Sequence, residues 1–103
     1  MNVDELVRHQ QAVLTGLLAA HGADMPPRIS CRISEAADEL LDPLVLPELL
    51  PAQDLLARQP KDVLDGAIAA LHDAIARADA RTALACGRAL RNLHVAADMW
   101  PNP

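Results

Sequence analysis

The chain has 103 residues, a formal net charge of −5 at pH 7 and, among Phe, Tyr and Trp, only the single Trp100. Hydrophobic residues make up 51% of the chain and are mostly alanine and leucine, which favour helices, whereas strands favour β-branched and aromatic residues. This composition excludes an intrinsically disordered chain and argues against a β-sandwich or barrel. We therefore predict one all-α domain over residues 1–103, built as a four- or five-helix bundle.

The charge and the residue types also limit the partners. Lys61 is the only lysine and there is no aromatic platform for base stacking, so a nucleic-acid partner is disfavoured. No apolar run approaches the roughly 20 residues that cross a bilayer, and acidic residues stand near the start, where an export signal carries positive charge. Cys31 and Cys86 lack metal-type spacing. We expect a cytoplasmic protein with reduced cysteines, no membrane contact and no cofactor.

Residues 2–21 have the pattern of an amphipathic helix. Asn2 is a suitable N-cap, Gly22 follows the last turn, and apolar residues recur at spacings of three and four between them;. Gln10 lies in the middle of the apolar face. A buried amide needs a hydrogen bond, so Gln10 either bonds across the core, reaches its edge, or sets the register of a helix pair.

Residues 28–34 repeat Arg-Ile-Ser around Cys31 and allow two interpretations. Alternating apolar residues are typical of a strand, but a single strand in this chain would have to pair with a second molecule. The helical interpretation continues the apolar pattern to residue 44, with Pro26 and Pro27 near the start, where proline is tolerated. We predict a helix.

Pro43, Pro47 and Pro51 recur every four residues and prevent a continuous helix;. This segment is nevertheless rich in leucine, and an apolar segment needs something to cover it. We therefore predict that it contributes to a partner-binding surface, and that Pro51 opens a short helix ending near Gln59. The leucines concerned are Leu44, Leu46, Leu49 and Leu50.

The last part of the chain predicts an antiparallel helix hairpin. One apolar stripe runs from Pro60 to residue 78 and a second begins at residue 83, out of phase with the first, so a break capped by Asp79 lies between them;. We expect Gly66 and Gly87 to permit close approach of the two backbones. Because alanine and leucine bury little area in so small a domain, we expect a homodimer.

Two residues of the hairpin could carry chemistry. If the helices fold back at Asp79, His72 comes level with Cys86, and such a pair could bind a metal ion or activate a thiolate. Two ligands do not complete a zinc site, so packing explains the pair more simply. The acidic row Glu35, Asp38, Glu39 and Asp42 is likewise explained as a solvated helix face.

Four arginines form the complementary feature. Arg81, Arg88 and Arg91 fall close together on one helix face and Arg77 lies just across the turn;. Guanidinium groups recognise carboxylates through paired donors. The row is therefore either a solvated face or a docking site for an acidic partner, such as segment 34–54 of a second copy. Trp100 either covers the end of the bundle or anchors a partner.

These features predict a non-enzymatic protein-interaction module: an adaptor, a chaperone or a neutralising partner of another protein, acting as a homodimer. The predicted partner-binding residues are the four leucines, the four arginines and Trp100. A small metal-binding protein or enzyme using His72 and Cys86 is the alternative. A helix-turn-helix regulator drawn through residues 60–97 is a weaker one, because the chain is acidic;.

Overall fold

A computed structural model of the chain describes residues 2–42, 50 and 52–101. All regular structure in these residues is helical, which confirms the all-α prediction. The elements are α1 (Val3–His21), the short 3₁₀ helix η1 (Gly22–Asp24), α2 (Pro27–Leu40), α3 (Ala52–Leu56), α4 (Pro60–Arg77) and α5 (Ala80–Asp98). The helical interpretation of residues 28–34 is thus correct and the strand interpretation is wrong.

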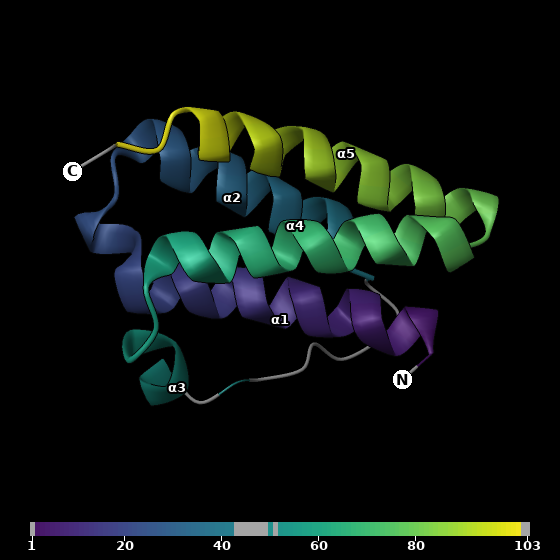
Figure 1. Cartoon of the computed structure of the whole chain (residues 1–103), viewed down its shortest axis with the longest axis horizontal. Coiled ribbons are helices and arrows are strands. Elements are labelled where there is room, and N and C mark those ends of the chain that lie inside the picture. Colours follow the sequence, from purple (N-terminus) through teal and green to yellow (C-terminus); the bar gives the residue numbers. More distant parts are fainter. Residues whose placement is uncertain (1, 43–49, 51, 102–103) are drawn as a thin grey trace.

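Four long helices form the bundle (Figure 1). α1 packs against α2 and α4, and α5 packs against the same two helices, so α2 and α4 lie on one diagonal. Neighbouring helices are antiparallel, including the predicted hairpin of α4 and α5. Because α2 and α4 run in the same direction, residues 41–59 connect opposite ends of the bundle. One long crossover of this kind is a known variant of the four-helix bundle.

The predicted helix starts are confirmed by their capping contacts. The Asn2 side chain accepts a hydrogen bond from the Glu5 amide at 2.8 Å, and Asp79 does the same for the Thr82 amide, also at 2.8 Å. These bonds satisfy amides that have no partner inside a helix. α2 and α4 instead begin with proline at their first positions, where the missing N–H costs nothing.

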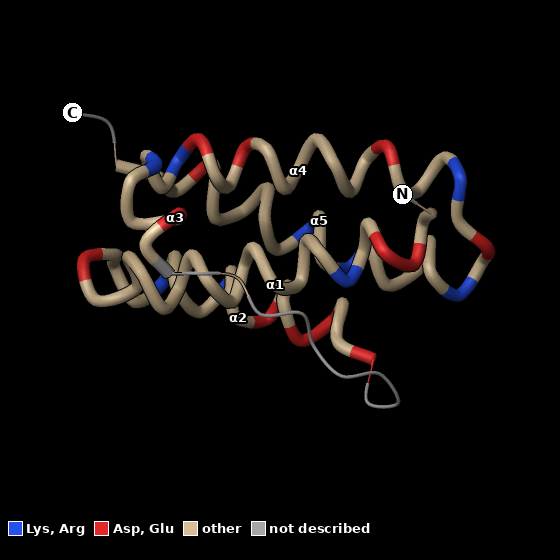
Figure 2. The backbone as a smooth tube through the Cα atoms, turned by 90° about the horizontal axis from the view of Figure 1, so that it is seen from below, with Lys and Arg blue, Asp and Glu red and all other residues tan. Residues whose placement is uncertain are grey.

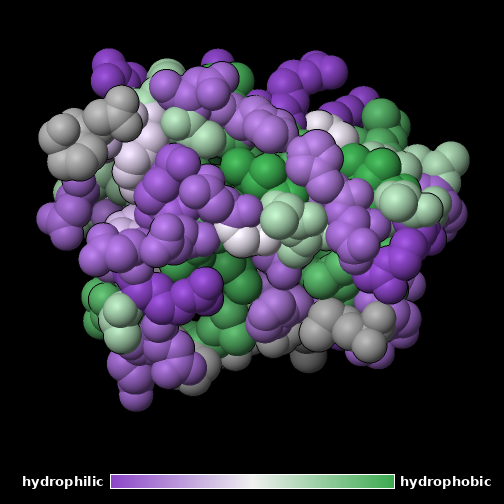
Figure 3. Space-filling view, in the orientation of Figure 1, coloured by the Kyte–Doolittle hydropathy of each residue, from purple (hydrophilic) through white to green (hydrophobic). Residues whose placement is uncertain are grey.

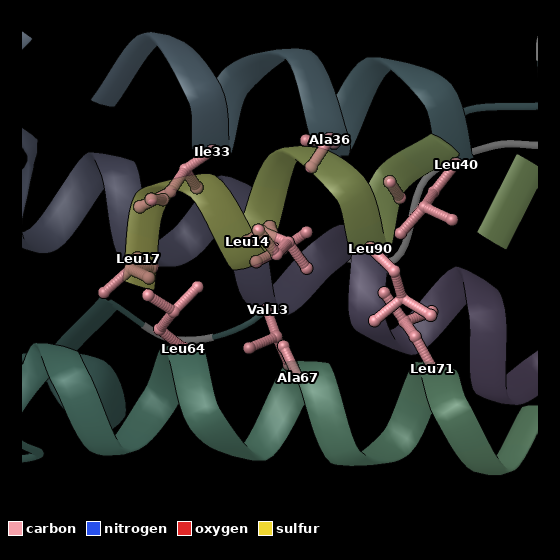
Figure 4. Packing of buried hydrophobic residues seen from close by; sticks show 14 of the residues in the cluster. Val13, Leu14, Leu17, Ile33, Ala36, Leu40, Leu64, Ala67, Leu71 and Leu90 are labelled. Atoms are coloured by element: carbon pink, nitrogen blue, oxygen red, sulfur yellow. The ribbon is translucent and has the colours of Figure 1, made fainter. Parts of the chain in front are cut away.

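The core is aliphatic and receives side chains from all the long helices (Figure 4). Its largest fully buried members have relative exposures below 2%: Leu14, Leu17, Ile29, Ile33, Leu64, Leu71, Leu93, Val63 and Cys86. Gln10 is also buried, as its position on the apolar face of α1 predicted. No fully buried side-chain nitrogen or oxygen of the described residues lacks a hydrogen-bond partner. The burial of Gln10 therefore leaves no fully buried amide atom without a hydrogen bond.

The short helix α3 docks on the outer side of α1. Leu55 is 3% exposed and lies directly over Gly16, where an added Cβ would overlap its side chain. His21 Nε2 lies 2.8 Å from the Leu55 carbonyl oxygen and forms a second link. The predicted extension of this helix to Gln59 is wrong, because α3 ends at Leu56.

The expectation for the two hairpin glycines is also wrong. A Cβ at Gly66 or Gly87 would meet nothing within 4 Å, so neither residue is needed for close approach of α4 and α5. Both helices bury alanine side chains in the core, among them Ala67, Ala74 and Ala89. The glycine at a close contact is Gly16, between α1 and α3.

Most of the proline-rich segment lies outside the described residues, including Leu44, Leu46 and Leu49. Leu50 is described: it is partly buried and packs against the core. In the described part of the chain, none of the helices combines the length and apolar character that a membrane-spanning helix requires.

Candidate interaction site

The outer face of α5 carries the arginine row that the sequence predicted. The buried side of α5 consists of Cys86, Ala89, Leu90, Leu93 and Ala96. On its exposed side, Arg81, Leu84, Arg88 and Arg91 recur at spacings of three and four. Leu84 is 56% exposed, which leaves an apolar side chain among the arginines. Leu84 was not among the predicted residues, although the same helical spacing that aligns the arginines includes it.

The arginines differ in their partners. Arg77 Nη2 lies 3.0 Å from Asp73 Oδ2, so this guanidinium is bound along α4 rather than gathered with the other three. Arg81 lies beside Asp79, whose pKa is lowered mainly by hydrogen bonds from Thr82 and to a lesser extent by this positive charge.

Arg88 and Arg91 form no side-chain hydrogen bond or ion pair with any residue in the described ranges. Within the described residues, their positive charges are therefore not compensated by direct contacts. A row of exposed donors of this kind is available to carboxylates of another molecule.

The neighbouring helix α2 carries the acidic row. Glu35, Asp38 and Glu39 are exposed on its second half (Figure 2). Arg32 Nη1 donates to Asn92 Oδ1 at 3.1 Å and lies 3.8 Å from Glu35 Oε2. This contact joins the outer sides of α2 and α5. Acidic and basic residues thus lie next to each other on one two-helix face.

One end of this face is hollowed. A depression of about 530 Å³ lies where the start of α1, the end of α2 and the start of α5 meet. Glu39 and Arg81 both line it, so its walls combine both charges and could receive a side chain of mixed polarity. Its remaining lining residues are Asp4, Val7, Arg8, Gln11, Leu40, Leu41, Asp42, Asp79, Thr82 and Ala85.

The structure places His72 and Cys86 in different surroundings. Cys86 is completely buried, and burial raises the pKa of its thiol, which opposes formation of a thiolate;. His72 is exposed, and its Nε2 atom lies 3.0 Å from Nε2 of His94. Both cysteines are free, with Cys31 exposed on α2. The alternative in which His72 and Cys86 form a metal or thiolate site therefore gains no support from the structure.

The pairing of His72 with His94 was not predicted, because height along the hairpin alone matches His72 with Cys86. Side chains of a helix lean toward its N-terminus. In the antiparallel pair the ring of His72 therefore leans away from the connecting turn and the ring of His94 leans toward it. The rings meet although the backbone of His94 lies farther from the turn than that of Cys86.

At the other end of the bundle, Trp100 is partly buried and packs against the core. With Met25, Pro26 and Ile29 it lines a second, smaller cavity of about 150 Å³. These contacts favour the interpretation that Trp100 covers the end of the bundle.

Neither models of protein families, nor curated proteins, nor solved structures gave a match to this chain. A function for this chain is therefore inferred from the geometry of its own residues.

Proposed function

We propose that the chain is a non-enzymatic protein-interaction module that acts as a homodimer through the face formed by α2 and α5. The observation that carries this proposal is Leu84, a leucine 56% exposed amid unpaired arginines on a helix face that no other described element covers. An apolar side chain surrounded by charged groups that can form hydrogen bonds is typical of a protein-binding surface.

Charge complementarity supports a second copy as the occupant. A twofold axis brings the same face of two molecules together, so that each residue pair occurs twice. If the axis passes between α2 and α5, the acidic row of one copy faces the arginine row of the other. Glu35 and Glu39 would then meet Arg88 and Arg81 of the other copy, and Leu84 would be covered.

The helix-turn-helix alternative receives no support from the hairpin. In that motif two helices cross at roughly 90–120°, whereas α4 and α5 lie side by side in antiparallel orientation (Figure 1). Hydrophobic patches between hydrophilic side chains, visible on the face that contains α4 and α5 (Figure 3), fit protein contacts better than a phosphate backbone;.

Light scattering after size-exclusion chromatography, over a range of protein concentrations, tests the homodimer. We expect the wild-type chain to form a dimer that weakens as salt is raised, since salt screens exposed charges. Arg88→Glu and Glu35→Arg should each favour the monomer through like-charge repulsion, and combining both changes should restore the dimer.

Arg58→Glu is the matched control. Arg58 is exposed and lies after α3, away from the α2 and α5 face, so the same change of charge there should leave the dimer intact. A wild-type chain that is monomeric at every concentration overturns the homodimer. Equal weakening by Arg58→Glu and Arg88→Glu overturns the assignment of the face.

A further inference from the structure

The histidine pair on the hairpin has the nitrogen–nitrogen separation of a chelate. His72 on α4 and His94 on α5 are exposed, and their Nε2 atoms face each other at 3.0 Å, with ring centroids 5.3 Å apart and ring planes at 57°. Without a metal, one ring can donate an N–H to the other. Such a contact uses the same two atoms that coordinate metals in proteins.

We propose that His72 and His94 form a surface site for a divalent transition-metal ion of the copper and zinc class. Imidazole nitrogens bind such ions at about 2.0–2.1 Å. Two nitrogens at that distance are then about 2.9 Å apart in a square arrangement and about 3.3 Å apart in a tetrahedral one. The observed 3.0 Å lies between these values. The ring centroids, 5.3 Å apart, place the two rings nearly end to end, so binding requires both rings to turn until their Nε2 electron pairs converge on one ion.

The surroundings of the two histidines indicate which other ligands the metal ion would have. Metal binding requires a free electron pair on both Nε2 atoms, so each ring carries its proton on Nδ1. Among the described residues, no group of three or more His, Cys, Asp or Glu could hold a metal ion. The pair therefore supplies two ligands, and water fills the other positions. Two ligands give a weaker site than the three or four of catalytic and structural zinc centres.

Nearby charges act in both directions. On α5, Arg91 precedes His94 by three residues and Asp98 follows it by four, so each lies about one helical turn away;. On α4, Asp73 is bound to Arg77. The local charges nearly cancel, and the imidazoles determine selectivity. The expected order of affinity is then Cu²⁺ above Zn²⁺, with no binding of Mg²⁺, which prefers oxygen ligands.

Isothermal titration of the untagged full chain with Cu²⁺, Zn²⁺ and Mg²⁺ tests the site. We expect one saturable equivalent of Cu²⁺ and of Zn²⁺, in the micromolar range for Zn²⁺, and none of Mg²⁺. His72→Gln and His94→Gln should each weaken binding by about tenfold or more, because loss of even an indirect partner of a metal ligand costs about 10–100-fold. Both positions are exposed, so circular dichroism should show folded variants.

His9→Gln is the matched control, since it also removes one histidine but leaves the pair intact. Zn²⁺ should raise the Tm of the wild type and of His9→Gln, and should raise it less in the two pair variants. Absence of saturable binding in the wild type overturns the proposal, as does binding that His72→Gln and His94→Gln leave unchanged.

Discussion

α1 and α5 are both 19 residues long and both begin with a side-chain cap, yet their outer faces differ. Both helices pack against α2 and α4, but α1 is also covered by α3, where Leu55 lies over Gly16. α5 has no comparable cover among the described elements and exposes Leu84. α3 thus covers the outer face of α1, whereas no described element covers the outer face of α5, which is where we place the interaction surface.

Truncating the two outer leucines should give the largest difference between these helices. Leu55→Ala removes a side chain that is 3% exposed and should lower the free energy of unfolding by about 2–5 kcal/mol. Leu84→Ala removes one that is 56% exposed and should change monomer stability by no more than about 0.5 kcal/mol. Urea unfolding at a concentration that keeps the chain monomeric measures both. Equal losses would contradict the assigned difference in cover.

Replacing a glycine in α1 and one in α5 should also distinguish the covered helix from the open one. Gly87→Ala should raise the free energy of unfolding by up to about 1 kcal/mol, because alanine favours the helix and its Cβ meets no atom;. Gly16→Ala gains the same propensity but must displace Leu55, so it should be less stable than Gly87→Ala. The difference between the two variants, measured by thermal unfolding, reports the docking of α3. Identical shifts would show that α3 does not constrain Gly16.

The Asp79 cap of α5 should make the free energy of unfolding depend on pH, because a carboxyl group titrates. The Asn2 cap of α1 has an amide side chain that does not titrate. Hydrogen bonds from Thr82 lower the pKa of Asp79 below its ordinary value of 3.8. The carboxylate therefore stabilises the fold above its unfolded pKa, and this stabilisation is lost as pH falls through the lowered folded value. Asp79→Asn keeps the capping oxygen without titrating. The stability difference between wild type and Asp79→Asn should shrink between about pH 5 and pH 2.

Thiol labelling should perturb the protein least. It should distinguish the exposed cysteine of α2 from the buried cysteine of α5. Cys31 is exposed, whereas Cys86 is buried and its thiol pKa is raised by burial. In the native protein one thiol per chain should react rapidly, and Cys31→Ser should abolish that rapid phase. Urea should release the second thiol. Rapid reaction of Cys86 in the folded Cys31→Ser variant would contradict its place in the core.

Local signals in the sequence predicted much of this fold. Capping residues at Asn2 and Asp79, prolines at helix starts and apolar spacing located the helices to within a few residues, because these signals act over a single turn. The docking of Leu55 on Gly16 and the pairing of His72 with His94 were not predicted. Both depend on where separate helices come to lie, and on the lean of side chains, which no single-helix pattern contains.

The candidate site was predicted in part for the same reason. The arginines of α5 share a face by helical spacing alone, and the structure confirms that Arg81, Arg88 and Arg91 are exposed. The sequence could not show that Arg77 binds Asp73, nor that α2 brings its carboxylates to the side of α5. The role of the proline-flanked leucines Leu44, Leu46 and Leu49 stays a prediction.

The crossover also has a consequence for how the chain folds. α1 with α2 and α4 with α5 are consecutive hairpins that close over short connections, so each can form early at a small entropic cost. Their assembly closes the longer connection between α2 and α4, because these two helices run in the same direction. Folding should therefore proceed by collapse of two local hairpins followed by a slower docking step, in which α1 meets α4 and α2 meets α5.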